Sequence, residues 1–243
     1  MGKFSGRRAL VTGAGAGIGR ATALKLAEMG AEVFALSKTQ ANLETLKQEC
    51  PSINIICVNL ENWTDAREAV KKILPIHHLV NNAGYAEVGP FLEATQECFD
   101  KIFNVGVKAM LNISQVVTAD LVTRQIRGSV VNLSSQAAQR ALKDHTVYCC
   151  AKSAVEMMTK MIALELGPKG IRCNAVAPTV VMTDMGRVGW ADPVKARDMI
   201  SRIPQGRFAE VEEVVNAIVF LLSDESDMVN GHSLPVDGGF LAA

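Results

Sequence analysis

The stretch Ala9-Leu10-Val11-Thr12-Gly13-Ala14-Gly15-Ala16-Gly17-Ile18-Gly19 decides the fold. An apolar run of strand length leads into a glycine-rich turn, and the segment that follows, Ile18–Met29, has the pattern of a helix. Glycine lets the backbone turn sharply and approach a pyrophosphate closely, while a helix N-terminus offers free N–H groups to phosphates. This strand–turn–helix context predicts a dinucleotide site, with contacts from Gly13, Gly15, Gly17, Ile18 and Gly19.

Short apolar runs alternate with longer helical segments along the rest of the chain. The expected strands are Ala9–Thr12, Glu32–Ser37, Asn54–Val58, His78–Asn81, Ser129–Leu133, Arg172–Ala177 and Ser233–Pro235. The expected helices are Ile18–Met29, Gln40–Glu49, Thr64–Leu74, Thr95–Thr123, Tyr148–Leu166 and Val211–Leu222. Nearly continuous apolar strands separated by helices indicate a parallel sheet covered on both faces. We therefore expect an α/β, Rossmann-type doubly wound parallel sheet of about seven strands.

The length of 243 residues predicts a single domain spanning residues 1–243. One stretch, residues 178–203, is weakly patterned and contains three Met, one Trp and two Pro. We expect it to be irregular and to form a lid over the substrate.

Composition excludes several functional classes. The formal net charge is zero, so no basic field is available to hold nucleic acid or an anionic membrane. The first residues contain no apolar signal core, and no uninterrupted apolar stretch approaches the ~18 residues of a membrane span. The six cysteines contain no C-x-x-C pair, so we expect reduced thiols and no metal site. These features predict a cytoplasmic protein without membrane insertion.

The end of the second expected strand indicates which nicotinamide cofactor binds. An NAD site places Asp or Glu there for the ribose 2′-hydroxyl. This chain reads Ala35-Leu36-Ser37-Lys38-Thr39, with a cation and no carboxylate. A 2′-phosphate would find donors in Ser37, Lys38 and Thr39 and no repelling charge. We therefore predict NADP(H); the alternative, a merely solvated Lys38, leaves the missing acid unexplained.

Tyr148 and Lys152 carry the expected chemistry. Positions four apart share one face of a helix, so the Lys152 ammonium should lie beside the Tyr148 phenol. A nearby positive charge favours the phenolate and lowers the pKa of the phenol from about 10. A tyrosine tuned in this way can move protons to and from an alcohol oxygen. The bland alternative is a pair of exposed helix residues.

The ordered set Thr12-Gly13-x3-Gly17-Ile18-Gly19, Asn81-Asn82-Ala83-Gly84, Ser135 and Tyr148-x3-Lys152 resembles the short-chain dehydrogenase/reductase family over essentially the whole chain. The resemblance implies that Tyr148 donates the proton to the substrate carbonyl. It implies that Ser135 hydrogen-bonds the same carbonyl oxygen, and that Lys152 tunes Tyr148 and holds the nicotinamide ribose. The nicotinamide would deliver the hydride.

Further residues receive roles from the same resemblance. Asn81, Ala83 and Gly84 would flank the adenosine ribose region, and Asn59 and Leu60 would meet the adenine. Val181 and Thr183 would contact the carboxamide and phosphates from the lid. Local strings such as Ser134-Ser135-Gln136 and Pro178-Thr179-Val180-Val181-Met182-Thr183 are similar to those of members that reduce L-xylulose and dicarbonyls. In that subgroup Gln136, His145 and Trp190 would face the substrate, although His145 could be a surface residue and Trp190 could cap a core.

One position departs from the family. Most members carry a catalytic Asn in the long middle helix, and here the string Phe103-Asn104-Val105-Gly106-Val107 places Gly106 there. Asn104 lies roughly 200° away around the helix and cannot replace it. In the family the helix breaks at this Asn, whose carbonyl holds a water linked to the lysine. Because glycine keeps the carbonyl and tolerates a break, we expect a proton relay that survives but is less rigid.

The expected activity is NADPH-dependent reduction of small polar carbonyls, chiefly L-xylulose to xylitol and α-dicarbonyls such as diacetyl to hydroxyketones. A 3-ketoacyl carrier-protein, steroid or retinoid reductase of the same family is an alternative. A non-catalytic dinucleotide-binding scaffold is an alternative of another class, suggested by Gly106. The resemblance also implies a homotetramer, with the helices Thr95–Thr123 and Tyr148–Leu166 at one interface. The apolar residues Met110, Val116, Val117, Met157 and Met161 could face that interface or the protomer's own core.

Overall fold

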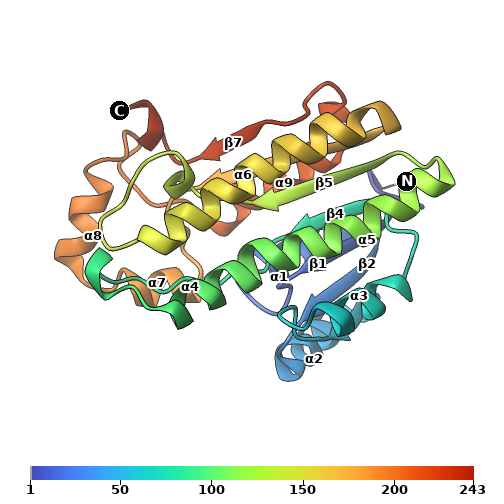
Figure 1. Ribbon diagram of the computed structural model, residues 1–243, viewed down its shortest axis with the longest axis horizontal. Coiled ribbons are helices and arrows are strands. Elements are labelled where there is room, and N and C mark those ends of the chain that lie inside the picture. The colour runs from blue at the N-terminus through green and yellow to red at the C-terminus, as the bar shows by residue number, and fades with distance from the viewer. Residues whose placement is uncertain (1) are drawn as a thin grey trace.

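The computed structural model describes residues 2–243 and contains a seven-stranded, fully parallel sheet in the order β3-β2-β1-β4-β5-β6-β7 (Figure 1). The strands are β1 (Arg8–Thr12), β2 (Glu32–Ser37), β3 (Asn54–Cys57), β4 (His78–Asn81), β5 (Gly128–Leu133), β6 (Ile171–Pro178) and β7 (Ser233–Val236). Every expected strand is present, with ends that differ by at most one residue. This order confirms the Rossmann-type doubly wound architecture.

The strands alternate their side chains between two apolar cores, one on each face of the sheet. In β1, for example, Ala9 and Val11 enter one core while Leu10 enters the other. Both faces of the sheet are therefore shielded from water, which explains the near-continuous apolar character of the strands. The longer helices cover the two faces.

Two groups of helices form these layers. The first core packs against α1 (Gly17–Glu28), α2 (Gln40–Glu49) and α9 (Val211–Leu222). The second packs against α3 (Trp63–Lys71), α5 (Ala109–Arg124) and α6 (Thr146–Leu166), and Figure 1 shows α5 and α6 crossing this face. Short 3-10 turns complete the chain at η1 (Phe91–Glu93), η3 (Gln136–Ala138), η4 (Gly167–Lys169), η5 (Asp224–Ser226) and η6 (Phe240–Ala242).

The expected long middle helix is interrupted. It consists of α4 (Gln96–Phe103), a π-helical turn η2 (Asn104–Lys108) and α5. Gly106 lies in the middle of the π turn and is buried. π turns inside helices are often found at functional sites, and this one is a local break of the kind that glycine tolerates.

The sequence pattern predicts an irregular segment over 178–203, and this prediction is wrong. The segment holds two short helices, α7 (Asp184–Gly189) and α8 (Pro193–Ile200). Residues of α8, together with Trp190 at the end of α7, pack in a small separate core that includes Met199, Ile203, Phe208 and Phe240. Figure 1 shows both helices beyond the carboxyl ends of the strands, where such folds bind their ligands.

The helical stretch Gln96–Arg124 is the one in residues 2–243 that is long and apolar enough to cross a bilayer by length and composition. Its most apolar window is 56% buried within the protein. The stretch therefore packs as a core helix against the sheet. Of the five apolar residues considered for an interface, Met110, Val116 and Val117 are buried in the protomer, whereas Met157 and Met161 are exposed.

Candidate active site

The three expected catalytic residues meet at the carboxyl end of β5. Ser135 follows this strand, while Tyr148 and Lys152 lie one turn apart in the first half of α6. The Ser135 hydroxyl accepts a hydrogen bond from the Ala137 amide at 3.2 Å and so caps η3. It also contacts the Tyr148 phenol closely enough to lower its pKa. The structure thus brings Ser135, Tyr148 and Lys152 into one cluster.

The Lys152 ammonium is half-buried. Its Nζ donates a hydrogen bond to the Leu133 carbonyl oxygen at 2.6 Å and lies 5.6 Å from the centre of the Tyr148 ring. Burial lowers the pKa of Lys152 to about 8. A group with this pKa changes charge near physiological pH, which is typical of catalytic sites.

The expectation that Lys152 lowers the pKa of Tyr148 does not hold for the protein without cofactor. Burial raises the pKa of Tyr148 above its ordinary value, the Ser135 hydroxyl counteracts this in part, and the Cys149 thiol adds to the rise. The physical reason is that burial disfavours the phenolate, while the ammonium is itself desolvated and directed at the Leu133 carbonyl. Tyr148 is therefore held protonated, the state that a proton donor requires.

The glycine turn has the close packing that a dinucleotide cradle needs. An added Cβ on Gly15 would lie 2.8 Å from Ser37 Oγ, and one on Gly19 would collide with the Gly13 carbonyl oxygen. Gly13 and Gly17 have positive φ values of 66° and 54°. The N-terminus of α1 has no side-chain cap and no acidic residue in its first turn. Its free N–H groups and positive end suit a pyrophosphate, so these residues fit the predicted cofactor.

Asn82, rather than Asn81, supports the turn with its side chain. The side-chain amide of Asn82 donates to the main-chain carbonyls of Thr12 and Gly13 at 3.0 and 3.2 Å. The Thr12 hydroxyl accepts from the main-chain N–H groups of Asn82 and Ala83. Asn81 is 3% exposed and its amide instead donates to Ser114 and Asn132 inside the protein. The Asn81 side chain thus braces β4 against α5 and β5.

The segment that begins at Asn81 ends close to Lys152. Ala83 is half-buried next to the turn, and an added Cβ on Gly84 would lie 3.9 Å from Lys152 Nζ. The turn after β4 therefore joins the phosphate cradle to the catalytic cluster, as expected for a residue set that follows one extended cofactor.

The predicted adenosine end is open to solvent. Lys38 and Thr39 are exposed after β2, and Lys38 forms no ion pair within residues 2–243. Asn59 is exposed and its side chain is bonded to Glu61, whereas Leu60 packs against the second core. The sheet order places β2 next to β1 and β3 next to β2, and the strands are parallel, so these residues lie at the same end of the sheet as the glycine turn.

The start of the lid lies over the glycine turn. Val181 forms an isolated bridge with Ala209, and the Thr183 hydroxyl accepts from the Gly186 amide at 3.0 Å to cap α7. An added Cβ on Gly17 would lie 3.2 Å from the Thr183 methyl group. Thr183 is therefore placed where a phosphate on the turn would reach it.

The three expected substrate residues have different surroundings. Gln136 is 2% exposed beside Ser135, and its Oε1 is without a hydrogen-bond partner in the described structure. The His145 ring centre lies 6.3 Å from that of Tyr148, and its Nδ1 is 2.6 Å from the Lys143 carbonyl oxygen. Trp190 packs on Phe208, with ring centres 5.5 Å apart, in the small core of the lid. The structure thus brings Gln136 and His145 to the catalytic cluster, while the contacts of Trp190 are those of a core residue.

A small cavity lies against the catalytic pair. It is lined by Gly84, Tyr85, Ile102, Gly106, Tyr148, Ala151, Lys152 and Val155. An added Cβ on Gly106 would meet nothing within 4 Å. The absent side chain at position 106 therefore leaves free space next to the groups that move the proton.

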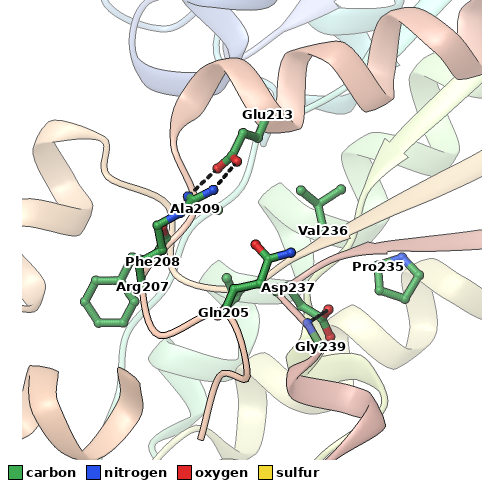
Figure 2. Close-up of a pocket in the computed structure, with 11 residues that line it drawn as sticks. Gln205, Arg207, Phe208, Ala209, Glu213, Pro235, Val236, Asp237 and Gly239 are labelled. Carbon is green, nitrogen blue, oxygen red and sulfur yellow. Dashed lines mark hydrogen bonds and ion pairs between the residues drawn. The ribbon is translucent and has the colours of Figure 1, made fainter. Parts of the chain in front are cut away.

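A second, larger cavity lies elsewhere. It has a volume of about 340 Å³ and lies between the ends of β6 and β7 and the start of α9, as Figure 2 shows. Its charged groups already have partners within the protein: Arg207 pairs with Glu213, and Asp237 accepts from the backbone of Gly239 and Leu241. Because the catalytic cluster does not line it, size alone does not identify the active site.

Several supporting residues escaped the sequence analysis. Thr12, Asn82 and Leu133 act through hydrogen bonds to or from the main chain. Thr12 and Asn82 stood in the quoted motifs, but only their contacts reveal their roles. Glu156 had a visible signal, since it lies four residues beyond Lys152 on the same helix face.

Comparisons with known proteins identify the family of the chain. The chain matches the family model described as Enoyl-(Acyl carrier protein) reductase over residues 13–241. It is 56% identical to L-xylulose reductase of Mesocricetus auratus, with 98% of each chain covered. It is 55% identical to D-erythrulose reductase of Gallus gallus, with 99% of this chain and 98% of the relative covered.

The solved structures include a gluconate 5-dehydrogenase from Burkholderia cenocepacia in complex with NADP and tartrate. It is 30% identical, covers 99% of this chain and 98% of its own, and has a TM-score of 0.94. The match extends over the sheet, the glycine turn and the catalytic cluster alike. The chain therefore belongs to the short-chain dehydrogenase/reductase family and is an oxidoreductase similar to the L-xylulose reductases.

Proposed function

We propose that this protein is an NADPH-dependent reductase of small polar carbonyls, which converts L-xylulose to xylitol and α-dicarbonyls such as diacetyl to hydroxyketones. The names of the two relatives, L-xylulose reductase and D-erythrulose reductase, support a short hydroxylated ketone as substrate. The bound NADP of the gluconate 5-dehydrogenase supports the cofactor.

Each residue around the substrate carbonyl would have a separate role. When bound, NADPH supplies a hydride to the carbonyl carbon. Tyr148, protonated because of its burial, gives its proton to the carbonyl oxygen. The Ser135 hydroxyl donates a hydrogen bond to the same oxygen and stabilises the charge that develops there. Lys152, fixed by Leu133, holds a positive charge next to the phenolate that remains.

The observation that carries the choice of substrate is the buried amide of Gln136. Its Oε1 lies in the interior beside Ser135 without a donor in the described structure. A buried acceptor left unpaired costs about 1–3 kcal/mol. A substrate hydroxyl next to the carbonyl would satisfy it, whereas an acyl chain or a steroid would not. This favours a sugar-like ketone over the apolar substrates of other family members.

The cofactor preference and the assembly belong to the same proposal. The exposed Lys38 cation, with Ser37 and Thr39 beside it, favours the 2′-phosphate of NADP(H). The exposed apolar residues of α6, Met157, Met161 and Leu164, suit a covered face in a homotetramer. The composition of the chain and its NADP(H) cofactor also favour a cytoplasmic location.

The test is a set of parallel assays of NADPH consumption with L-xylulose, diacetyl, acetoacetyl thioester, a ketosteroid and retinal. We expect the highest kcat/KM with L-xylulose and measurable turnover of diacetyl. The variant Gln136→Leu, similar in size but without an acceptor, should raise the KM for L-xylulose about tenfold or more and change diacetyl less. Preference for the thioester, steroid or retinal would redirect the assignment within the family, and no turnover of any carbonyl would refute it.

A further inference from the structure

A third polar side chain shares the catalytic face of α6. Tyr148, Lys152 and Glu156 follow one another at intervals of four residues and so lie in one row along the helix. Glu156 is 9% exposed. A buried carboxylate is costly unless several donors satisfy it, so its surroundings reveal what it holds.

The Glu156 carboxylate receives hydrogen bonds from three side chains in two other parts of the fold. Oε1 accepts from Ser134 Oγ at 3.2 Å, from Gln139 Nε2 at 3.0 Å and from Ser233 Oγ at 2.6 Å. Oε2 accepts from the same Gln139 amide at 3.3 Å. Within residues 2–243 the carboxylate forms no salt bridge, and the Lys152 ammonium is directed at Leu133 instead.

Two of these donors bracket the catalytic serine. Ser134 immediately precedes Ser135, and Gln139 is the C-terminal cap of η3, the turn that Ser135 begins. Glu156 therefore holds both ends of the segment 134–139 against the helix that carries Tyr148 and Lys152. The third donor, Ser233, lies on β7 and anchors the carboxylate from the other side.

We propose that Glu156 is a positioning residue for carbonyl reduction, which clamps the segment 134–139 to α6 and thereby fixes the Ser135 hydroxyl against the Tyr148 phenol. The proposal rests on the reductase activity proposed above. Ser135 must reach the carbonyl oxygen that Tyr148 protonates, and a displacement of about 1 Å can cost on the order of a hundredfold in rate.

The clamp also has a consequence that does not require turnover. The Ser135 hydroxyl lowers the pKa of Tyr148 against the effect of burial. The other titratable groups around this phenol are Lys152 and Cys149 on α6, His145 at its start, and Tyr85, which lines the same small cavity. None of these is bonded to Glu156, so loosening the clamp should change the Ser135 contact alone and raise the pKa of Tyr148.

Three variants separate positioning from general stability. Glu156→Gln keeps the shape and removes the charge, Gln139→Met removes the η3 donor at similar volume, and Ser233→Ala removes only the anchor on β7. We expect about a tenfold lower kcat for Glu156→Gln and Gln139→Met, with the KM and fluorescence-measured Kd for NADPH within about twofold of wild type. Ser233→Ala should stay within about twofold in kcat. The double variant Glu156→Gln/Gln139→Met should lose no more than Glu156→Gln alone.

The readout without turnover is the ionisation of Tyr148. The chain has two tyrosines, so in a Tyr85→Phe background the ultraviolet difference titration reports Tyr148. Glu156→Gln should move this titration to higher pH, and Ser233→Ala should not. An unchanged titration and kcat, or equal losses in all three variants together with weaker NADPH binding, would overturn the proposal. Failure of the wild type to reduce any carbonyl would refute the activity and leave the titration to decide the clamp.

Discussion

Lys152 and Leu133 are joined by a 2.6 Å hydrogen bond from the ammonium to the main-chain carbonyl oxygen, which ties α6 to the end of β5. The bond fixes the cation beside the Tyr148 ring without pairing it with a carboxylate. The cation thus remains available to the phenolate and to a ribose hydroxyl. It also remains partly unsatisfied, and this has a measurable effect on stability.

Replacement of this lysine, Lys152→Met, should abolish reduction and stabilise the fold. The folded pKa of Lys152 is about 8 against an ordinary value of 10.5, so the buried charge costs folding free energy below pH 8, and the cost disappears as pH rises through 10.5. Removal of this cost, about 2 kcal/mol of folding free energy at pH 7, should raise Tm by about 4–8 °C for a chain of this size. Calorimetry at pH 7 and pH 10 checks this: the gain should shrink at the higher pH. A lower Tm at pH 7 would show that the Leu133 bond outweighs burial.

Removal of the phenolic hydroxyl in Tyr148→Phe should reduce kcat by about 10²–10⁴-fold, the range of a lost general acid. NADPH binding, followed by its fluorescence, should persist because the aromatic ring and Lys152 remain. In the wild type, kcat for reduction should fall as pH rises through the pKa of Tyr148, since only the protonated phenol donates. Substantial activity in the Phe variant would assign the proton to another group.

Gly106→Asn should raise turnover modestly. The π turn places position 106 beside the catalytic pair, and an added Cβ there meets nothing within 4 Å. An amide would fill the free space and make the proton relay more rigid. The control is Gly106→Ala, which adds the Cβ without the amide and should leave kcat nearly unchanged. A large fall in kcat for the Asn variant alone would show that the relay of this chain depends on the cavity.

Lys38→Asp should exchange the cofactor preference. A carboxylate at the end of β2 would repel the 2′-phosphate and accept from a ribose 2′-hydroxyl. We expect kcat/KM for NADPH to fall about 10–100-fold while that for NADH rises. Steady-state kinetics with both cofactors checks this, and Lys47→Asp, a change of the same charge on α2, serves as the control. Equal loss with both cofactors would indicate damage to the fold instead.

His78 should make the protein sensitive to acid. Burial lowers the pKa of His78 to about 3, with the nearby charges of His77, Arg7 and Arg172 acting in the same direction. The unfolded chain, with a histidine pKa near 6.5, therefore takes up the proton first as pH falls. The free energy of unfolding should drop by about 2 kcal/mol between pH 6.5 and pH 5 from this group. Urea unfolding at both values checks this, and His78→Leu should show a smaller decrease.

The order of the helices and strands and the candidate proton-transfer residues were predictable from local sequence patterns. Short, mainly apolar runs between helical segments predicted every strand, because strands covered on both faces are rich in apolar residues. The spacing of Tyr148 and Lys152 predicted their common face, because helix geometry depends only on sequence separation. The aligned motif indicated that Gly106 would tolerate a break, but the expected helix Thr95–Thr123 was continuous and only the structure shows the π turn.

Other features depended on contacts between distant residues. The small core of the lid forms only when α8 and Trp190 meet Phe208 and Phe240, which no local pattern shows. Asn81 and Asn82 are neighbours with similar chemistry, yet the strand alternation buries one side chain and directs the other to the glycine turn.

The sequence by itself determined the elements, the glycine turn and the choice of candidate catalytic residues, since each is encoded over a few consecutive positions. The tertiary structure decided the burial that raises the pKa of Tyr148, the bond from Lys152 to Leu133 and the contacts of Glu156. These properties depend on desolvation and on donors and acceptors supplied by segments far apart in the chain, which come together only when the sheet is assembled.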